Sequence, residues 1–526
     1  MSPSAVSTEL HDWCPKCNPW LIAVSVMLAT FMEVLDTSIA AVALPYIAGS
    51  VSATTDEATW VLTSYLVANA VVLPASTWFS LRFGRKRFLL LCIVIFTAAS
   101  FACGSSTSLA MILIARAIQG AGGGALQPIS QAILMESFPP AKRGSAMAVF
   151  ALGVVVAPVL GPTLGGWLTE QYTWRWAFYI NIPIGILAIF MISRFVEDPP
   201  YIKNAHPRTF DSIGLGLLAV WVGTLQIILD KGQEDDWFGA VWIRWAAAVL
   251  LISFVAFLIR QLRARQPIVD LSIFKNRNFA MGCLLIGLFG AVIYGVVTIL
   301  PLFYQTIMGY SAWAAGLAVA PRGVGAILIM PVVAILTSRL DNRWLILAGF
   351  VLFGITSLEF GSLTLEISQW SLFWPIVLSG CASGMVFVPL STVAMGTLSN
   401  EQMGNAAGLY NLIRNVGGSV GISMVDTLVA RHEQVHRAEM LHHLTFQNPA
   451  FRHAFRQTQA IMAAHAGPVA ARARTLAVIN RALESQSALW SYVDDFRYIA
   501  LACFGCGVIV FFLKGVKGRK GAAPAH

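Results

Sequence analysis

The chain has 526 residues, a formal net charge of +9, 57% hydrophobic residues and only 12% charged residues. Soluble domains carry about 25% charged residues, so this composition excludes a soluble globular protein and indicates a membrane protein with many spans. The basic residues lie in short loops between apolar stretches, where they indicate orientation in the membrane. The positive charge therefore does not predict nucleic acid as a partner.

About fourteen apolar stretches, each long enough to cross a bilayer, follow one another along the chain. A helix satisfies its own backbone hydrogen bonds in lipid, so these stretches predict an all-α membrane protein. The expected spans are 20–46, 58–80, 88–105, 109–132, 145–168, 174–194, 211–229, 240–260, 279–304, 312–337, 344–361, 370–395, 405–430 and 489–513.

Lysine and arginine residues gather in alternate loops between these spans, which places those loops in the cytoplasm by the positive-inside rule. An even number of spans then puts both termini in the cytoplasm. No signal peptide is expected before the first span, and the helix from Trp20 should remain uncleaved. Cys14 and Cys17 form a C-x-x-C pair, which could be half a zinc site or a redox pair but lacks a second pair or a βαβ context to support either. No cofactor is expected.

The last outward segment, 431–488, is long, polar and rich in histidine. The stretches 457–464 and 475–483 have helical spacing, which predicts short amphipathic helices. The segment could dock a partner outside the cytoplasm, or it could be a solvated cap over the outer mouth. A histidine metal site or pH sensor lacks tight ligand spacing.

Asp36 lies near the middle of the first apolar span. An ionised carboxylate there costs roughly 2.5–3.5 kcal/mol on translocon scales, so we expect it to have a function, of which proton carriage is the first. Glu33 lies about one helical turn away on the same face, and Arg116 in span four could supply the counter-charge. The alternative is an acid that a neighbouring helix or backbone satisfies.

The fifth span contains closely spaced glycines and prolines, namely Gly153, Gly161, Pro162, Gly165 and Gly166. Small residues four apart let a neighbouring helix approach closely, and prolines bend the helix. This pattern suits a rocking interface, although a static packing seam has the same composition.

Four stretches together resemble the fourteen-span drug:proton antiporters of the major facilitator superfamily. These are 161–166 in span five, 35–45 around Asp36, 116–120 around Arg116, and 174–185. The resemblance implies two six-helix bundles with two inserted helices. The implied divisions are a cytoplasmic N-terminus 1–19, an N-terminal bundle 20–197, a linker with two extra helices 198–265, a C-terminal bundle 266–513 that includes the long periplasmic loop 431–488, and a cytoplasmic tail 514–526.

The resemblance also implies a function, which is the proton-coupled export of hydrophobic or amphipathic drugs across a cell inner membrane. It implies a periplasmic adaptor and an outer-membrane channel as partners. Two alternatives remain: a dedicated exporter of one metabolite such as a fatty acid, siderophore or natural product, and a non-transporting membrane sensor. The sequence contains no Walker lysine motif, no H-E-x-x-H and no nucleophile elbow, so no enzyme is expected.

One motif departs from the family pattern. The loop between spans two and three keeps Arg82, Gly84 and Arg85, but Leu81 stands where the family has an aspartate. That acid ordinarily helps to lock the cytoplasmic side, so the gate here must depend on other residues.

Polar and aromatic residues of the other spans complete the expected site. They could bind varied hydrophobic ligands, because aromatic surfaces bind by contact area. The arginines could instead snorkel to an interface, and the aromatics could simply pack. The candidates are Phe31, Tyr65, Tyr294, Phe303, Tyr304, Phe387, Arg322, Asn411 and Arg414.

Overall fold

The computed structural model describes residues 15–139, 142–199, 202, 211–264, 267–399 and 402–514. These residues form helices and contain no strand, which confirms the predicted all-α fold. Cys14, most of the N-terminus 1–19, most of the connection 198–210 and nearly all of the tail 514–526 lie outside the described residues.

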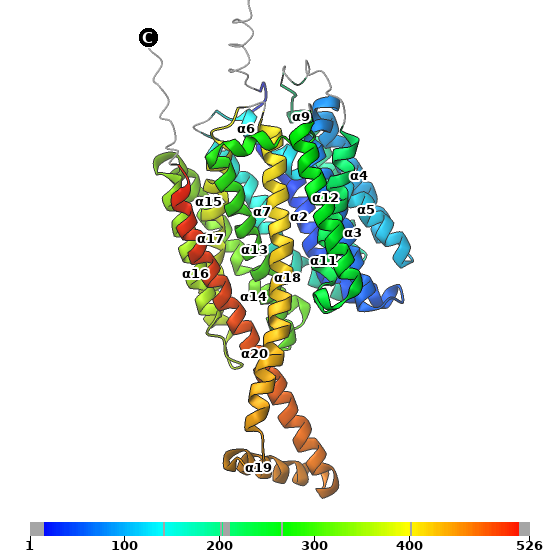
Figure 1. Ribbon diagram of the computed structural model, residues 1–526, viewed down its shortest axis with the longest axis vertical. Helices are drawn as coiled ribbons and strands as arrows, with labels where there is room; N and C mark the ends of the chain where they lie inside the picture. The colour runs from blue at the N-terminus through cyan, green and yellow to red at the C-terminus, as the bar shows by residue number, and fades with distance from the viewer. Residues whose placement is uncertain are drawn as a thin grey trace, which may run out of the picture.

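The N-terminal half is a bundle of six spans (Figure 1). The fourth span is broken at Gly124 and Ala125, and the sixth is broken at Ile180. The helices are α2 (Pro19–Ser50), α3 (Thr55–Phe83), α4 (Arg85–Gly104), α5 (Leu109–Gly123), α6 (Leu126–Ser137), α7 (Arg143–Gln171), α8 (Trp176–Tyr179) and α9 (Asn181–Phe195).

Two further spans, α11 (Ser212–Lys231) and α12 (Val241–Arg263), join the halves. One short turn, η2 (Trp237–Gly239), lies between them, and another, η3 (Leu271–Lys275), follows them. Helix α11 packs on α3, whereas α12 packs mainly on α11.

The C-terminal half is a second bundle. Its helices are α13 (Arg277–Thr306), α14 (Ala312–Val319), α15 (Pro321–Arg339), α16 (Asn342–Phe360), α17 (Gln369–Met395), α18 (Met403–His443), α19 (Pro449–Ala466), α20 (Pro468–Ile509) and η4 (Val510–Phe512).

Thirteen helices in the described part of the chain are long and apolar enough to cross a membrane. The remaining predicted span, 405–430, is the first part of α18, which packs along α13 inside the bundle. It is less apolar than the others because it contains Asn411, Arg414, Asn415 and Asp426. The protein is therefore a multi-pass membrane protein.

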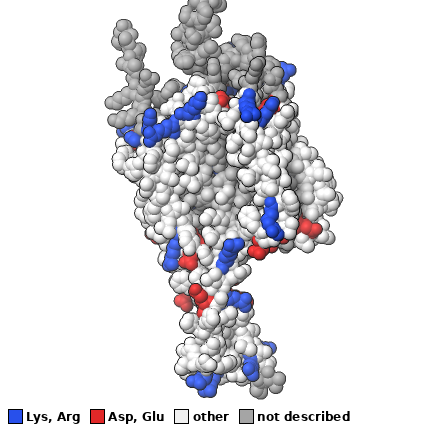
Figure 2. Space-filling view, viewed as in Figure 1, with Lys and Arg blue, Asp and Glu red and all other residues white. Residues whose placement is uncertain are grey.

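The segment 431–488 is a helical hairpin that extends beyond the bundle (Figure 1). Instead of forming separate short helices, α18 and α20 continue outward without a break, and only α19 is a short amphipathic helix. No glycine or proline interrupts 431–443, so α18 continues. Gly467, at φ +76°, and Pro468 end α19 and begin α20. Figure 2 shows Lys and Arg side chains gathered at the opposite end of the molecule and charges of both signs on the hairpin.

Helix α7 packs along α2 within its own half and also contacts α14, α15 and α17 of the other half. A Cβ atom at Gly161 would collide with the side chain of Ser38, and one at Gly153 would lie 3.1 Å from the backbone oxygen of Met27. The glycines of the fifth span therefore allow α2 and α7 to approach closely. Pro162 and Thr163 lie against Gly316 of α14, and Thr163 Oγ1 donates a hydrogen bond to the Gly316 oxygen at 2.8 Å.

Candidate transport site

Asp36 is fully buried at a junction of α2, α5 and α9. Its Oδ2 accepts a hydrogen bond from Arg116 Nη1 at 2.6 Å, and its Oδ1 accepts from Gln119 Nε2 at 2.8 Å and Asn181 Nδ2 at 2.7 Å. Ser100 Oγ accepts hydrogen bonds from both amides, which holds them in place. Three donors therefore hold the buried Asp36 carboxyl group in place.

Arg116 is also fully buried and contacts groups on three helices. Its Nε donates to the Val61 backbone oxygen at 2.9 Å, and its Nη1 donates to Gln119 Oε1 at 2.7 Å as well as to Asp36. The guanidinium lies 4.3 Å from the centre of the Tyr65 ring, a cation–π contact. Tyr65 is thus a buried support for Arg116. It does not line the cavity described below.

Glu33, one turn before Asp36, has fewer partners. Its Oε1 accepts a hydrogen bond from Asn69 Nδ2 at 3.0 Å, whereas its buried Oε2 has no hydrogen-bond partner among the described residues. The side chains of Asn69 and Gln127 lie next to this carboxyl group, and the charges of Arg414 and Asp36 interact with it at longer range. The two acids therefore occupy different environments, although they lie on one helix face.

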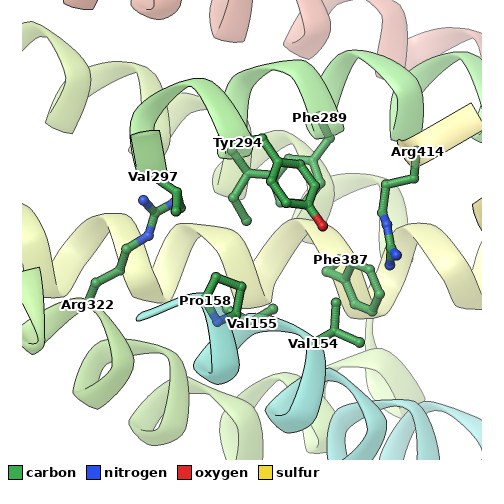
Figure 3. A pocket seen from close by; sticks show the side chains of 10 residues that line it. Val154, Val155, Pro158, Phe289, Tyr294, Val297, Arg322, Phe387 and Arg414 are labelled. Atoms are coloured by element: carbon green, nitrogen blue, oxygen red, sulfur yellow. The ribbon is translucent and has the colours of Figure 1, made fainter. Parts of the chain in front are cut away.

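A narrow cavity lies between the two halves, beside the middle of α7 (Figure 3). Arg322 and Arg414 stand at its two ends, and the Tyr294 ring projects between them. The lining is otherwise mainly apolar and consists of Val154, Val155, Pro158, Phe289, Ile293, Val297 and Phe387. None of the described residues that line the cavity is an acid.

Neither cavity arginine has a carboxylate partner among the residues that the structure describes. Arg322 is 3% exposed, and its Nη2 donates a weak hydrogen bond to Ser383 Oγ at 3.4 Å. Arg414 is 2% exposed and donates to the side-chain oxygens of Gln127 and, at 3.2 Å, Asn415. Its Nε and Nη1 have no hydrogen-bond partner in the described part of the chain. Two buried cations thus face one apolar space.

Helix α6 reaches across to α18 through two amide groups. Gln127 accepts from Arg414, and Gln131 Oε1 accepts from Asn411 Nδ2 at 2.8 Å. The Gln127 side chain also lies next to Glu33, so it stands between Glu33 of the first half and Arg414 of the second. Asn411 therefore bridges the halves and does not line the cavity.

The remaining predicted ligand residues lie elsewhere. Phe303 and Tyr304 are buried in a separate cluster, where Phe303 packs against Tyr492 of α20 and Tyr304 against Tyr310. Phe31 is partly buried against the apolar cluster of the first half. Tyr294, Phe387, Arg322 and Arg414 are the predicted ligand residues that line the cavity.

Two acids from other parts of the chain contact the loop with the altered motif, Glu136 of α6 and Asp198 after α9. Gly84 has a φ of +86°, and Arg85 is 4% exposed and forms an ion pair with Glu136 at the end of α6. Asp198 Oδ1 accepts from the Lys86 backbone nitrogen at 2.9 Å. Glu136 thus pairs with the motif's arginine although Leu81 replaces the family's aspartate. Arg82 is exposed.

Motif analysis did not single out Gln119, Asn181, Asn69, Gln127 or Glu136 as functional residues. Two of them lay within the stretches that carried the family resemblance, 116–120 and 174–185. The signal that could have found them is an amide or acid inside an otherwise apolar span, because such a group must find a partner in lipid.

Residues 26–422 match the sequence profile of the Major Facilitator Superfamily. The chain belongs to this superfamily of membrane transporters, as its motifs predicted.

Among curated relatives, it is 37% identical over 431 residues to "Multidrug export protein EmrB" of Escherichia coli (strain K12), covering 82% of this chain and 84% of the relative. It is 35% identical to the protein of that name in Haemophilus influenzae, covering 94% and 95%. It is 40% identical to "Fatty acid resistance protein FarB" of Neisseria gonorrhoeae, covering 81% and 83%.

The stretches 226–232, 266–271 and 139–143 also predicted similarity to EmrB, and the comparison confirms it.

Solved structures support the fold alone. A double-tryptophan variant of XylE superposes with a TM-score of 0.61 at 13% identity, covering 95% of this chain and 97% of that one. The human organic anion transporter MFSD10 superposes with a TM-score of 0.58 at 15% identity, covering 92% and 99%.

Proposed function

We propose that this protein is a proton-coupled antiporter that exports hydrophobic or amphipathic drugs and toxic compounds by alternating access. The proposal depends on the buried ion pair of Asp36 and Arg116, with Glu33 nearby. The two halves also enclose an apolar cavity that has an arginine at each end. Several relatives named as multidrug export proteins support the same conclusion. No covalent chemistry is needed for this activity, so we infer a transporter and not an enzyme.

In this proposal the two acids exchange protons at different stages. Asp36 is ionised while Arg116, Gln119 and Asn181 donate to it, and it takes a proton only when the contact with Arg116 opens. Only one of the two Glu33 oxygens has a hydrogen-bond partner among the described residues, so protonating Glu33 disrupts fewer contacts than protonating Asp36. A ligand bound near Arg414 changes the electrostatic potential at Glu33, which couples ligand binding to proton binding.

Helix α7 supplies the moving seam in this proposal. Its glycines face α2 on one side, and Thr163 and Pro162 contact Gly316 of the other half. Rocking of one bundle against the other about a central site is the general mode of such folds. The pair of Arg85 and Glu136 would hold the loop after α3 when the cytoplasmic side is closed.

A second candidate is a dedicated exporter of an acidic lipid-like metabolite. Two buried arginines lie at the ends of an apolar cavity, and no described carboxylate pairs with them. They favour this alternative, because an amphipathic anion satisfies both features. The relative named as a fatty acid resistance protein is consistent with it. Transport assays with neutral and acidic amphipaths distinguish the candidates.

We further infer that the protein lies in a cell inner membrane with both termini in the cytoplasm. The arginine and lysine residues at the end opposite the hairpin support this orientation. The hairpin would then extend into the periplasm, where it would dock a membrane fusion adaptor and, through it, an outer-membrane channel. Its length beyond the bundle supports that role.

The transport proposal is tested with Asp36→Asn. We expect the variant to insert normally but to lose gradient-driven efflux, because an amide cannot carry a proton. Drug accumulation is measured in cells with and without a collapsed proton gradient. Glu359→Gln, the same class of change at an exposed site on α16, is the control and should transport normally. Unchanged efflux in Asp36→Asn would falsify the proposal.

The adaptor proposal is tested by deleting about residues 440–480 and joining α18 to α20 with a short flexible turn. The contacts of α18 with α20 nearer the bundle, such as His436 with Asp494, would remain. Membrane insertion should persist while co-purification with an adaptor is lost. Undiminished co-purification would count against docking on the hairpin.

A further inference from the structure

The two helices of the hairpin are joined by a group of histidines and aspartates where they leave the bundle. His436 Nε2 lies 2.8 Å from Asp494 Oδ2, and His432 Nδ1 lies 3.5 Å from Asp495 Oδ1. The histidines are one turn apart on α18, and the aspartates are adjacent on α20. These four residues are called the neck cluster below.

The members of the neck cluster differ in their access to water. Asp495 is 1% exposed, and neither of its oxygens has a hydrogen-bond partner among the described residues. The side chains of His432 and His436 are each 22% exposed. A buried acid without hydrogen bonds thus faces a solvent-accessible histidine, an arrangement in which a bound proton supplies the missing charge or donor.

The surroundings of the neck cluster are mostly acidic. Tyr498 stacks on His432, and Trp490 lies beside His436. Arg497 pairs with Asp494 at 3.4 Å and contacts Gly361 after α16, while Arg437 pairs with Glu484 farther along the hairpin. Thr306 of α13 hydrogen-bonds with Tyr492. Four further acids lie around the neck cluster. Asp426, Glu433 and Glu439 are on α18, and Asp230 on α11 lies near Asp426.

We propose that the neck cluster is a proton-binding site, filled from the hairpin side, whose occupancy holds α18 and α20 together. With both histidines neutral, acids on the two helices face one another, and Arg497 is the cation that pairs with the cluster. Proton uptake by the two histidines gives Asp495 a cationic partner and gives Asp494 a second one beside Arg497. The helices are then clasped at low pH, and the clasp loosens as pH rises.

This site is separate from the acids of the transport site, since it lies on α18 and α20 and not on α2. The same α18 carries Arg414 at the cavity and contacts α6 through Asn411. Changes in the clasp would therefore reach both the hairpin and the bundle. The proposal adds a pH-dependent hinge to a transporter and does not depend on which compound it exports.

The test uses the full-length protein in lipid nanodiscs, with spin labels at the exposed positions Leu441 on α18 and Leu476 on α20. Distances are measured by pulsed electron paramagnetic resonance at pH 5.5 and pH 8, on either side of the ordinary range for histidine. We expect a narrow distribution at low pH and a broader, longer one at high pH.

Two variants and a control make the test decisive. Changing His432 and His436 together to glutamine should give the broad distribution at both pH values. Asp494→Asn with Asp495→Asn should remove the pH dependence, because the repulsion is gone. His442→Gln with His443→Gln, at exposed positions farther along α18, should behave like the wild type. Identical wild-type distributions at both pH values, or full pH dependence in the first variant, would overturn the proposal.

Discussion

Buried arginines occupy both halves of the molecule, but their surroundings are opposite. In the first half, Arg116 pairs with Asp36 at 2.6 Å within a network of amides and hydroxyls. In the second half, Arg322 and Arg414 lie at an apolar cavity without a carboxylate partner among the described residues. Burying an unpaired charge costs free energy. Helix packing alone therefore does not explain why Arg322 and Arg414 lie at the cavity.

In the proposed function, this difference separates two tasks. A closed network around Asp36 holds a charge in a defined place and can exchange a proton only when it opens. Unpaired cations next to an apolar surface are prepared for a ligand with an acidic group. In the proposed function, the first half handles protons and the arginines of the second half bind the cargo, with Gln127 between them.

The largest expected effect concerns stability. Arg116→Met should destabilise the protein by about 3–5 kcal/mol, because it leaves the Asp36 carboxylate buried and unpaired. Arg322→Met should be neutral or stabilising, since it removes a buried cation that has no carboxylate partner. Thermal unfolding in detergent, followed by tryptophan fluorescence, measures both. Equal destabilisation by the two variants would remove the distinction between the halves.

Removing one amide from the Asp36 network should have a smaller effect. Asn181→Ala deletes one of three donors to the carboxylate, and a hydrogen bond to a charged group contributes about 1.5–3 kcal/mol. The same unfolding measurement checks this value. Asn480→Ala, on the exposed part of α20, is the control and should change little. If Asn181→Ala lowers the stability no more than Asn480→Ala, the hydrogen bond from Asn181 to Asp36 does not stabilise the protein.

The cavity arginines should affect transport more than stability. In Arg322→Gln we expect efflux of a fluorescent fatty acid to fall about tenfold, which corresponds to about 1.4 kcal/mol of binding. Efflux of a neutral dye should stay within a factor of about two. Arg343→Gln, at the far end of the second half, is a matched control. A uniform loss for both compounds would argue that Arg322 is structural.

The smallest effect is expected at Tyr294. Its ring projects into the cavity, so Tyr294→Phe keeps the apolar contact and removes only the hydroxyl (Figure 3). Substrate affinity should change by less than about 1 kcal/mol. Tyr304→Phe, in the separate cluster near α20, should leave affinity unchanged. Direct binding in detergent measures both, and a larger effect at Tyr304 would place the ligand outside the cavity.

The spans and the family could be predicted because they depend on local pattern. Apolar length sets a membrane helix, and the motifs around Asp36, Arg116 and Gly161 are short and specific. The structure also brings Asp36 and Arg116 into contact. Their role in proton coupling stays a prediction.

Other features could not be predicted because they depend on which helix faces which. Tyr294 and Phe303 lie nine residues apart, and at about 100° per residue they point to opposite faces of α13. Only Tyr294 reaches the cavity. The contact of Asn411 with Gln131 joins residues far apart in the sequence, so no local pattern indicates it. The helix α18 continues into the hairpin because 431–443 contains no glycine or proline. The polar composition of this segment did not indicate a continuous helix.

The central claim is that cargo and protons bind in exchange, and proton release measures it most directly. The purified protein in weakly buffered detergent solution receives a hydrophobic acidic drug, supplied as its anion, while a pH dye records free protons. We predict that the wild type releases protons upon binding, and that Asp36→Asn with Glu33→Gln binds the drug without release. Drug binding with no proton release from the wild type would contradict the account.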